Sequence, residues 1–146
     1  YRIAKDVVSA LQGQAAAKQV QLAVSGESAA VTGVGTYLYE MVYNLCDNAI
    51  KYNVEGGSVV ITVAPSGSGA ELTVRDTGIG IPREHQDRVF ERFFRVDKSR
   101  SKASGGTGLG LSIVKHIAQY HHAAVSLSSR VGEGTTIRVA FPAKQS

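Results

Sequence analysis

The chain has 146 residues, 43% of them hydrophobic and 19% charged, with a formal net charge of +4 at pH 7. This balance is typical of one globular domain and excludes a disordered chain. No apolar run approaches the roughly 20 residues needed to span a bilayer. The one cysteine, Cys46, argues against a disulfide scaffold and fits a reducing compartment. Because the sequence starts at Tyr1 without an initiator methionine, we expect a fragment of a longer protein.

The spacing of apolar residues predicts helices and strands in alternation. In chain order we expect helix 1–18, strand 21–24, a short edge strand 31–32, helix 36–52, strands 58–64 and 71–76 joined by a loop at 65–69, a short helix 83–95, helix 111–121, and strands 124–128 and 135–141. A mixed sheet with its helices packed on one face would bury these patterns.

The helix expected over residues 36–52 carries a polar stripe beside its apolar face. Spacings of three and four place four polar side chains on one side of it, with Tyr52 next to them: Glu40, Asn44, Asn48 and Lys51. An asparagine costs a helix roughly 0.5 kcal/mol relative to alanine, so two of them suggest a functional reason. Considered alone, the stripe is explained equally well as a solvated edge.

A glycine-rich segment lies directly before the helix expected at residues 111–121. Gly106, Gly108 and Gly110 alternate with Thr107 and Leu109. Glycines let a backbone approach a ligand closely, and the first N–H groups of a helix attract phosphate. A plain flexible turn is the simpler explanation when this segment is taken by itself.

A second glycine turn follows the strand expected at residues 71–76. Asp76 ends that strand, and Gly78 and Gly80 follow it. Its carboxylate could accept a hydrogen bond from an exocyclic amine such as that of adenine. An aspartate that only satisfies its own turn amides is again the simpler explanation in isolation.

Taken together, the motifs form an ordered series: NLCDNAIKY, DTGIGIP, FERFFR, GGTGLGLSI and GEGTT. This series resembles the Asn box, the two glycine boxes and the Phe box of the ATP-binding catalytic domain of bacterial sensor histidine kinases, in the gyrase, Hsp90, histidine kinase and mismatch-repair ATPase superfamily. The resemblance implies the Bergerat fold, a two-layer α/β sandwich whose mixed, mainly antiparallel sheet of about five strands is covered on one face by three helices. It implies a single catalytic domain over residues 1–146, with a mobile ATP lid at roughly 96–107.

The resemblance also implies roles for the motif residues. Asn48 would be the Mg²⁺ ligand, and Asn44 would shape the site around it. Lys51 would contact phosphate and Tyr52 would lie beside the adenine. Asp76 would read the adenine amine in a pocket lined by Gly78, Gly80, Ile81 and Thr135. The phosphate loop would consist of Gly106, Thr107, Gly108, Leu109 and Gly110. Arg95 would be the catalytic cation nearest the γ-phosphate.

The implied reaction is γ-phosphoryl transfer from Mg-ATP to a histidine on a separate dimerisation and phosphoacceptor hairpin of the same kinase, which serves a response regulator. The chain's own histidines match no acceptor motif. ATP hydrolases of the superfamily carry a glutamate at the position of Asn44; because an amide cannot act as a base, hydrolysis is disfavoured. A nucleotide-binding regulatory module without catalysis stays open as an alternative, and no nucleic-acid partner is expected. We expect a monomeric fragment of a homodimeric kinase, from the cytoplasmic portion of a membrane-anchored receptor.

Overall fold

The computed structural model of the chain describes residues 2–26, 35–66, 69–81, 83, 86 and 110–142. Within these ranges the helices are α1 (Arg2–Ala17), α2 (Gly35–Lys51) and α4 (Gly110–Tyr120). The strands are β1 (Gln21–Gly26), β2 (Ser58–Ser66), β3 (Gly69–Asp76), β4 (Ala124–Arg130) and β5 (Gly134–Phe141). The edge strand expected at 31–32, the lid expected at 96–107 and nearly all of the helix expected at 83–95 lie outside the described residues.

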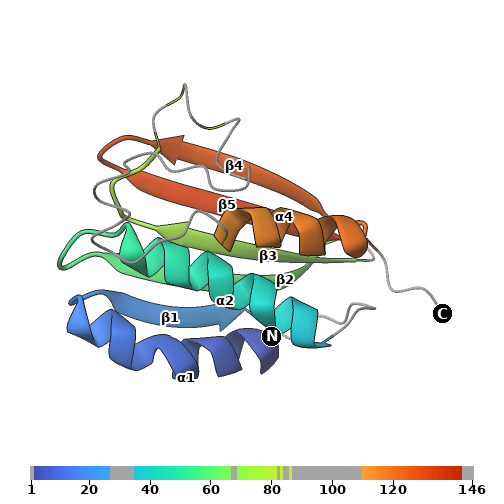
Figure 1. Cartoon of the computed structure of the whole chain (residues 1–146), viewed down its shortest axis with the longest axis horizontal. Helices are drawn as coiled ribbons and strands as arrows, with labels where there is room; N and C mark the ends of the chain where they lie inside the picture. Colours follow the sequence, from blue (N-terminus) through green and yellow to red (C-terminus); the bar gives the residue numbers. More distant parts are fainter. Residues whose placement is uncertain are drawn as a thin grey trace.

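The strands form one sheet in the order β1-β2-β3-β5-β4 (Figure 1). β1 and β2 run parallel, and the other neighbours run antiparallel. A parallel pair needs a crossover connection, and α2 lies in that connection. The loop expected at residues 65–69 is mostly strand, because Pro65 pairs with Ala70 and Ser66 with Gly69. Pro, Ser and Gly are poor strand formers, so only the pairing with the neighbouring strand reveals the longer hairpin.

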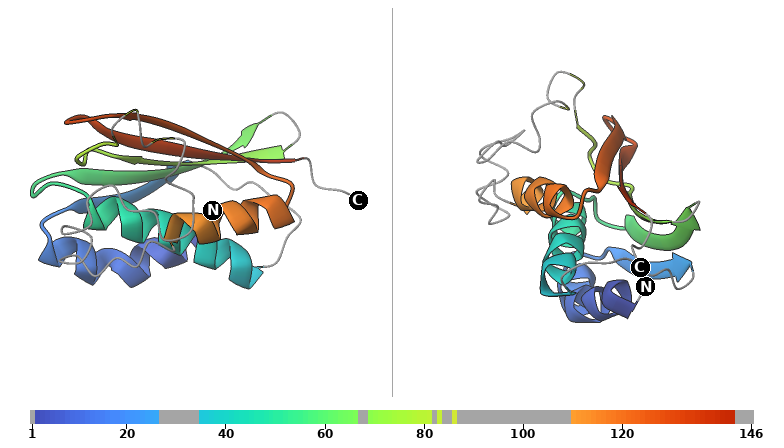
Figure 2. Two further views of the ribbon diagram at one scale, coloured as in Figure 1. Left: turned by 45° about the horizontal axis from the view of Figure 1, so that its top comes forward. Right: turned by 90° about the vertical axis from the view of Figure 1, so that its right-hand side faces the viewer.

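The three described helices all lie on the same face of the sheet (Figure 2). Every second residue of β3 and β5 is buried against them: Leu72, Val74, Ile137 and Val139. This alternation is what a sheet with one covered face requires. The predicted two-layer sandwich, with a mixed and mainly antiparallel sheet, is therefore confirmed.

Helix α2 is the centre of the helical layer and lies between α1 and α4 (Figure 1). Its predicted apolar face is confirmed, since Met41, Leu45, Cys46 and Ile50 are all fully buried. Burying a large apolar side chain contributes about 1.5–3 kcal/mol, so this face anchors the helix firmly to the sheet. The polar stripe of α2 is held in place as a consequence. None of the described helices is long and apolar enough to cross a lipid bilayer.

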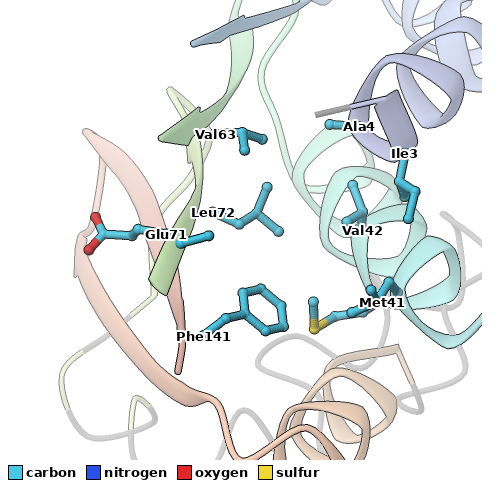
Figure 3. Close-up of a pocket in the computed structure, with 10 residues that line it drawn as sticks. Ile3, Ala4, Met41, Val42, Val63, Glu71, Leu72 and Phe141 are labelled. Atoms are coloured by element: carbon cyan, nitrogen blue, oxygen red, sulfur yellow. The ribbon is translucent and has the colours of Figure 1, made fainter. Parts of the chain in front are cut away.

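An apolar cavity of about 70 Å³ lies between the sheet and the helices (Figure 3). It is lined by residues from α1, α2 and three strands: Ile3, Ala4, Leu38, Met41, Val42, Val63, Ala70, Glu71, Leu72 and Phe141. The carboxylate of Glu71 points away from it in Figure 3. Ligand pockets usually measure about 300–1,000 Å³, so this cavity is too small for a nucleotide. It lies at the end of β3 opposite to Asp76.

Candidate functional site

A polar row crosses three neighbouring strands at one end of the sheet. Asp76 on β3 pairs directly with Thr135 on β5, and Thr135 pairs with Ser129 on β4. Residues opposite one another in antiparallel strands project from the same face. The next row inward is apolar and packs into or against the core: Val74, Ile137 and Leu127. The polar row therefore lies on the helix-covered face, where the hydrophobic core ends.

Asp76 is half-buried and is oriented by backbone groups. Its Oδ1 accepts hydrogen bonds from the N–H groups of Gly78 at 2.9 Å and Thr135 at 3.2 Å. Burial raises the pKa of Asp76, and these two hydrogen bonds oppose that rise. No described residue donates a hydrogen bond to the other oxygen, Oδ2. The side chain can therefore offer one fixed acceptor to a ligand.

The turn after Asp76 is enclosed on two sides. The N–H of Ile79 donates to the carbonyl of Tyr52 at 3.1 Å, just past the end of α2. A Cβ at position 78 would approach the same carbonyl oxygen to 2.5 Å, so Gly78 permits this close packing. Gly80 has a φ of +76°, and a Cβ there would clash with the carbonyl of Arg130 in the β4–β5 hairpin. The turn thus joins the end of α2 to the far edge of the sheet.

Ser129 connects this turn to the polar row. Its Oγ accepts the N–H of Ile81 at 2.8 Å, donates to the carbonyl of Gly134 at 3.0 Å, and lies 2.8 Å from Thr135 Oγ1. Gln86 Nε2 donates to the carbonyls of Ile81 and Ser129 at 2.9 and 3.1 Å. Ser129 is absent from the predicted site residues, because the strand predicted at 124–128 ends one residue before it. Ser129 could have been recognised from the alternation of β4, because it follows Val125 and Leu127 at the same spacing of two and is polar where they are apolar.

The side chains of the polar stripe of α2 differ in the partners that they contact. Asn44 Nδ2 donates to the carbonyl of Glu40 at 2.8 Å, which ties this carboxamide to its own helix. Asn48 is half-buried, and its carboxamide makes no hydrogen bond to any described residue. The ammonium of Lys51 forms an ion pair with Asp47 at 3.1 Å. The Asn48 carboxamide is therefore not engaged by the described residues, whereas the Lys51 ammonium is engaged by Asp47.

Asn53, predicted only as part of a turn, fixes the end of α2 to the sheet. It is 1% exposed. Its Nδ2 donates to the carbonyl of Ser58 at 3.0 Å, and its Oδ1 accepts the N–H of Val54 at 2.8 Å and the hydroxyl of Thr77 at 3.5 Å. A buried asparagine with such partners is costly to replace. It keeps the Asn48-bearing helix beside the Asp76 turn.

Several predicted site residues lie outside the described part of the chain: Arg95, Gly106, Thr107, Gly108 and Leu109. Gly110, expected directly before a helix starting at residue 111, is the first residue of α4. His116 and His122 are exposed, whereas His121 is buried and has Nδ1 2.9 Å from the carbonyl of Ile117. Among the described residues, no cluster of His, Cys, Asp and Glu could hold a metal ion by itself.

Comparison with known proteins agrees with this arrangement. Residues 33–145 match the family of histidine kinase-, DNA gyrase B- and HSP90-like ATPases. The chain is 48% identical over 112 residues to the sensor-like histidine kinase SenX3 of Mycolicibacterium smegmatis, which covers 77% of this chain and 29% of SenX3. The chain thus spans less than a third of that relative.

Solved structures share the fold over nearly the whole chain. The mycobacterial sensor histidine kinase MprB has a TM-score of 0.84 at 29% identity, over 99% of this chain and 95% of the MprB chain. Full-length ShkA, solved in complex with AMPPNP, has a TM-score of 0.82 at 26% identity, over 99% of this chain and 30% of ShkA. The chain therefore belongs to the family of histidine kinase-, DNA gyrase B- and HSP90-like ATPases, as a catalytic domain of the sensor histidine kinase type.

Proposed function

We propose that the chain binds Mg-ATP between the polar row and the C-terminal half of α2, and passes the γ-phosphoryl group to a histidine of a separate hairpin. The observation that carries the proposal is the half-buried Asp76 carboxylate, which is anchored at Oδ1 and has no described partner at Oδ2. The shared fold with ShkA, solved with the ATP analogue AMPPNP, supports the same location for the nucleotide.

The adenine would bind at the polar row. Asp76 Oδ2 would accept a hydrogen bond from the 6-amino group, since a carboxylate is purely an acceptor. Gly78, Gly80 and Ile81 would line the pocket, and Thr135 would contact the same purine edge. Tyr52, whose carbonyl already accepts a hydrogen bond from this turn, would flank the base.

Asn48 would bind the Mg²⁺ that accompanies the triphosphate. Magnesium takes hard oxygen ligands and usually combines one or two protein oxygens with phosphate oxygens. The carboxamide of Asn48 fits this requirement because none of its groups is engaged by a described residue. When bound, the ion would neutralise charge on the phosphates. Lys51 would add a cation after exchanging Asp47 for phosphate.

The phosphates would lie at the segment that leads into α4, formed by residues 106–110. Backbone N–H groups at a helix start favour anions, and Gly110 is the first residue of α4. Residues 96–107 would act as the ATP lid, and Arg95 would stabilise the charge on the γ-phosphate during transfer.

Phosphoryl transfer is favoured over ATP hydrolysis by the residue at position 44. Hydrolases of this superfamily carry a glutamate there as the base that activates water, and Asn44 cannot take up a proton. Its carboxamide is moreover bonded to the carbonyl of Glu40. The acceptor would be a helical hairpin of the same kinase, in a homodimeric and membrane-anchored parent protein whose cytoplasmic part includes this domain and acts on a response regulator.

Calorimetric titration of the 146-residue chain with ATP, with and without Mg²⁺, tests the proposal directly. We expect a dissociation constant between about 1 µM and 1 mM. Asn48→Ala should lose the Mg²⁺-dependent part of the affinity, and Glu55→Gln, an exposed carboxylate in the turn before β2, should bind normally. Absence of ATP binding by the wild-type chain would contradict the proposal. Transfer of labelled phosphate to an added acceptor hairpin then separates a kinase from a passive binder.

A further inference from the structure

One hydroxyl group, that of Ser129, has three polar partners, and only one arrangement of hydrogens makes all three contacts hydrogen bonds. The N–H of Ile81 can only donate, so Ser129 Oγ accepts it. The carbonyl of Gly134 can only accept, so the one hydrogen of Ser129 goes there. The remaining contact, 2.8 Å between Ser129 Oγ and Thr135 Oγ1, must then be donated by Thr135.

This arrangement determines what Thr135 can offer to a ligand. Its only side-chain hydrogen is directed at Ser129, so its oxygen has lone pairs alone for any other partner. No other described residue makes a hydrogen bond with Thr135 Oγ1. Asp76, the direct neighbour of Thr135 across the β3–β5 pair, is also an acceptor. The two side chains therefore form a surface of acceptors.

Such a surface distinguishes purines by the group at position 6. A 6-amino group has two hydrogens and can donate to both acceptors, whereas a 6-oxopurine offers one donor on this edge, its N1–H, beside an acceptor oxygen and cannot satisfy both. A site with buried polar groups rejects a ligand that leaves those groups unpaired. The selection depends on Ser129, because without it the hydroxyl of Thr135 could rotate and donate.

We propose that Ser129 is a specificity-determining residue, which selects adenine over 6-oxopurine nucleotides by taking the hydrogen of Thr135. The inference rests on the proposed function, in which the polar row binds the base. Ser129 acts through Thr135 and need not touch the nucleotide. It is therefore a positioning residue.

The test compares dissociation constants for Mg-ATP and Mg-ITP by calorimetry, because inosine carries a 6-oxo group and an N1–H where adenosine has a 6-amino group and an unprotonated N1. Wild type should prefer ATP. In Ser129→Ala the ratio of the ITP dissociation constant to the ATP dissociation constant should fall about tenfold, because the freed hydroxyl of Thr135 can donate one hydrogen bond to the 6-oxo group of ITP. Ser129→Thr keeps the hydroxyl and should restore the preference. Ser128→Ala, an exposed position on the same strand, is the matched control and should behave as wild type.

If Ser129→Ala keeps the wild-type ratio of ITP to ATP dissociation constants, the inference is overturned. If that variant fails to fold, Thr135→Val serves instead: it removes the acceptor and should narrow the same ratio, and an unchanged ratio would overturn the inference equally. A wild-type chain that binds neither nucleotide contradicts the proposed function and the inference together. A wild-type chain that binds ATP, with an unchanged ratio in the variants, contradicts the inference alone.

Discussion

The backbone N–H of Thr135 donates a hydrogen bond to Asp76 Oδ1 across 3.2 Å, between residues that pair directly on β5 and β3. The same oxygen accepts the N–H of Gly78 from the turn that follows. Two separate segments of backbone thus orient one carboxylate. Both donors are backbone N–H groups, which a substitution at position 76 does not remove. A different side chain with an acceptor oxygen can therefore be held in the same orientation.

Asp76→Asn should separate nucleotide binding from stability. The amide oxygen can still accept both backbone hydrogen bonds, but the amide nitrogen would face the adenine amine as a second donor. We expect ATP affinity to fall at least about tenfold in calorimetric titration. Wild-type affinity in this variant would exclude Asp76 as the residue that reads the base.

The stability of Asp76→Asn follows from the direction of the pKa shift. Burial raises the pKa of Asp76 in the folded chain. Its favourable contribution to stability is therefore complete below its unfolded pKa and is lost as pH rises through the folded pKa. At pH 7 the asparagine should unfold at the same urea concentration or a higher one. Asp76→Ala, which leaves two N–H groups without their acceptor, should instead lose about 1–3 kcal/mol.

Cys46 should make the fold sensitive to alkaline pH. Burial, with a smaller contribution from the charge of Asp47, raises the pKa of the thiol from 9.0 to about 12. Its contribution to stability is thus complete below pH 9 and lost as pH rises toward the folded pKa, by at most about 1.4 kcal/mol per pH unit. Urea unfolding from pH 8 to 10.5 should show a shallower decline for Cys46→Ala than for wild type. Equal slopes would show that the thiol does not titrate as its burial requires.

The apolar cavity predicts opposite effects for two valines on the core-facing side of β2. Val63 lines the cavity, so Val63→Ile should fill space and raise the free energy of unfolding by about 0.5–1 kcal/mol. Val59 is fully buried and does not line the cavity, so Val59→Ile should overpack the core and cost about 1–3 kcal/mol. Thermal or urea unfolding measures both. Destabilisation of equal size in the two variants would mean that the cavity does not admit a methyl group.

Two asparagines near the end of α2 should respond differently to alanine. Asn53→Ala removes a fully buried side chain with described backbone partners, and we expect a loss of about 2–3 kcal/mol. Asn48→Ala removes no hydrogen bond to a described residue and exchanges asparagine for the best helix former, so its stability should match or exceed wild type. Urea unfolding beside Mg-ATP titration distinguishes them. A large loss of stability in Asn48→Ala would indicate a structural role for this residue.

Helices and strands whose apolar residues recur at one regular spacing could be predicted from the sequence, because the burial of that apolar face alone determines the element. The apolar face of α2 and the inward alternation of β5 need only a partner surface, and their predicted bounds agree with the structure to within two residues. The ordered motifs likewise pointed to Asp76, Asn48 and their family. The sequence pattern could not show how these side chains are engaged.

The tertiary structure decided the contacts between segments far apart in the chain. Ser129 and Thr135 form their hydrogen bond only because β4 and β5 pair in one register, and Ile81 joins them from 48 residues away in sequence. The burial of Asn53 depends in the same way on a distant neighbour, Thr77, which contacts it from 24 residues away in sequence. Hydrophobic burial is non-directional and can be read from a pattern, whereas hydrogen bonds require specific distances and angles that exist only after the chain has folded.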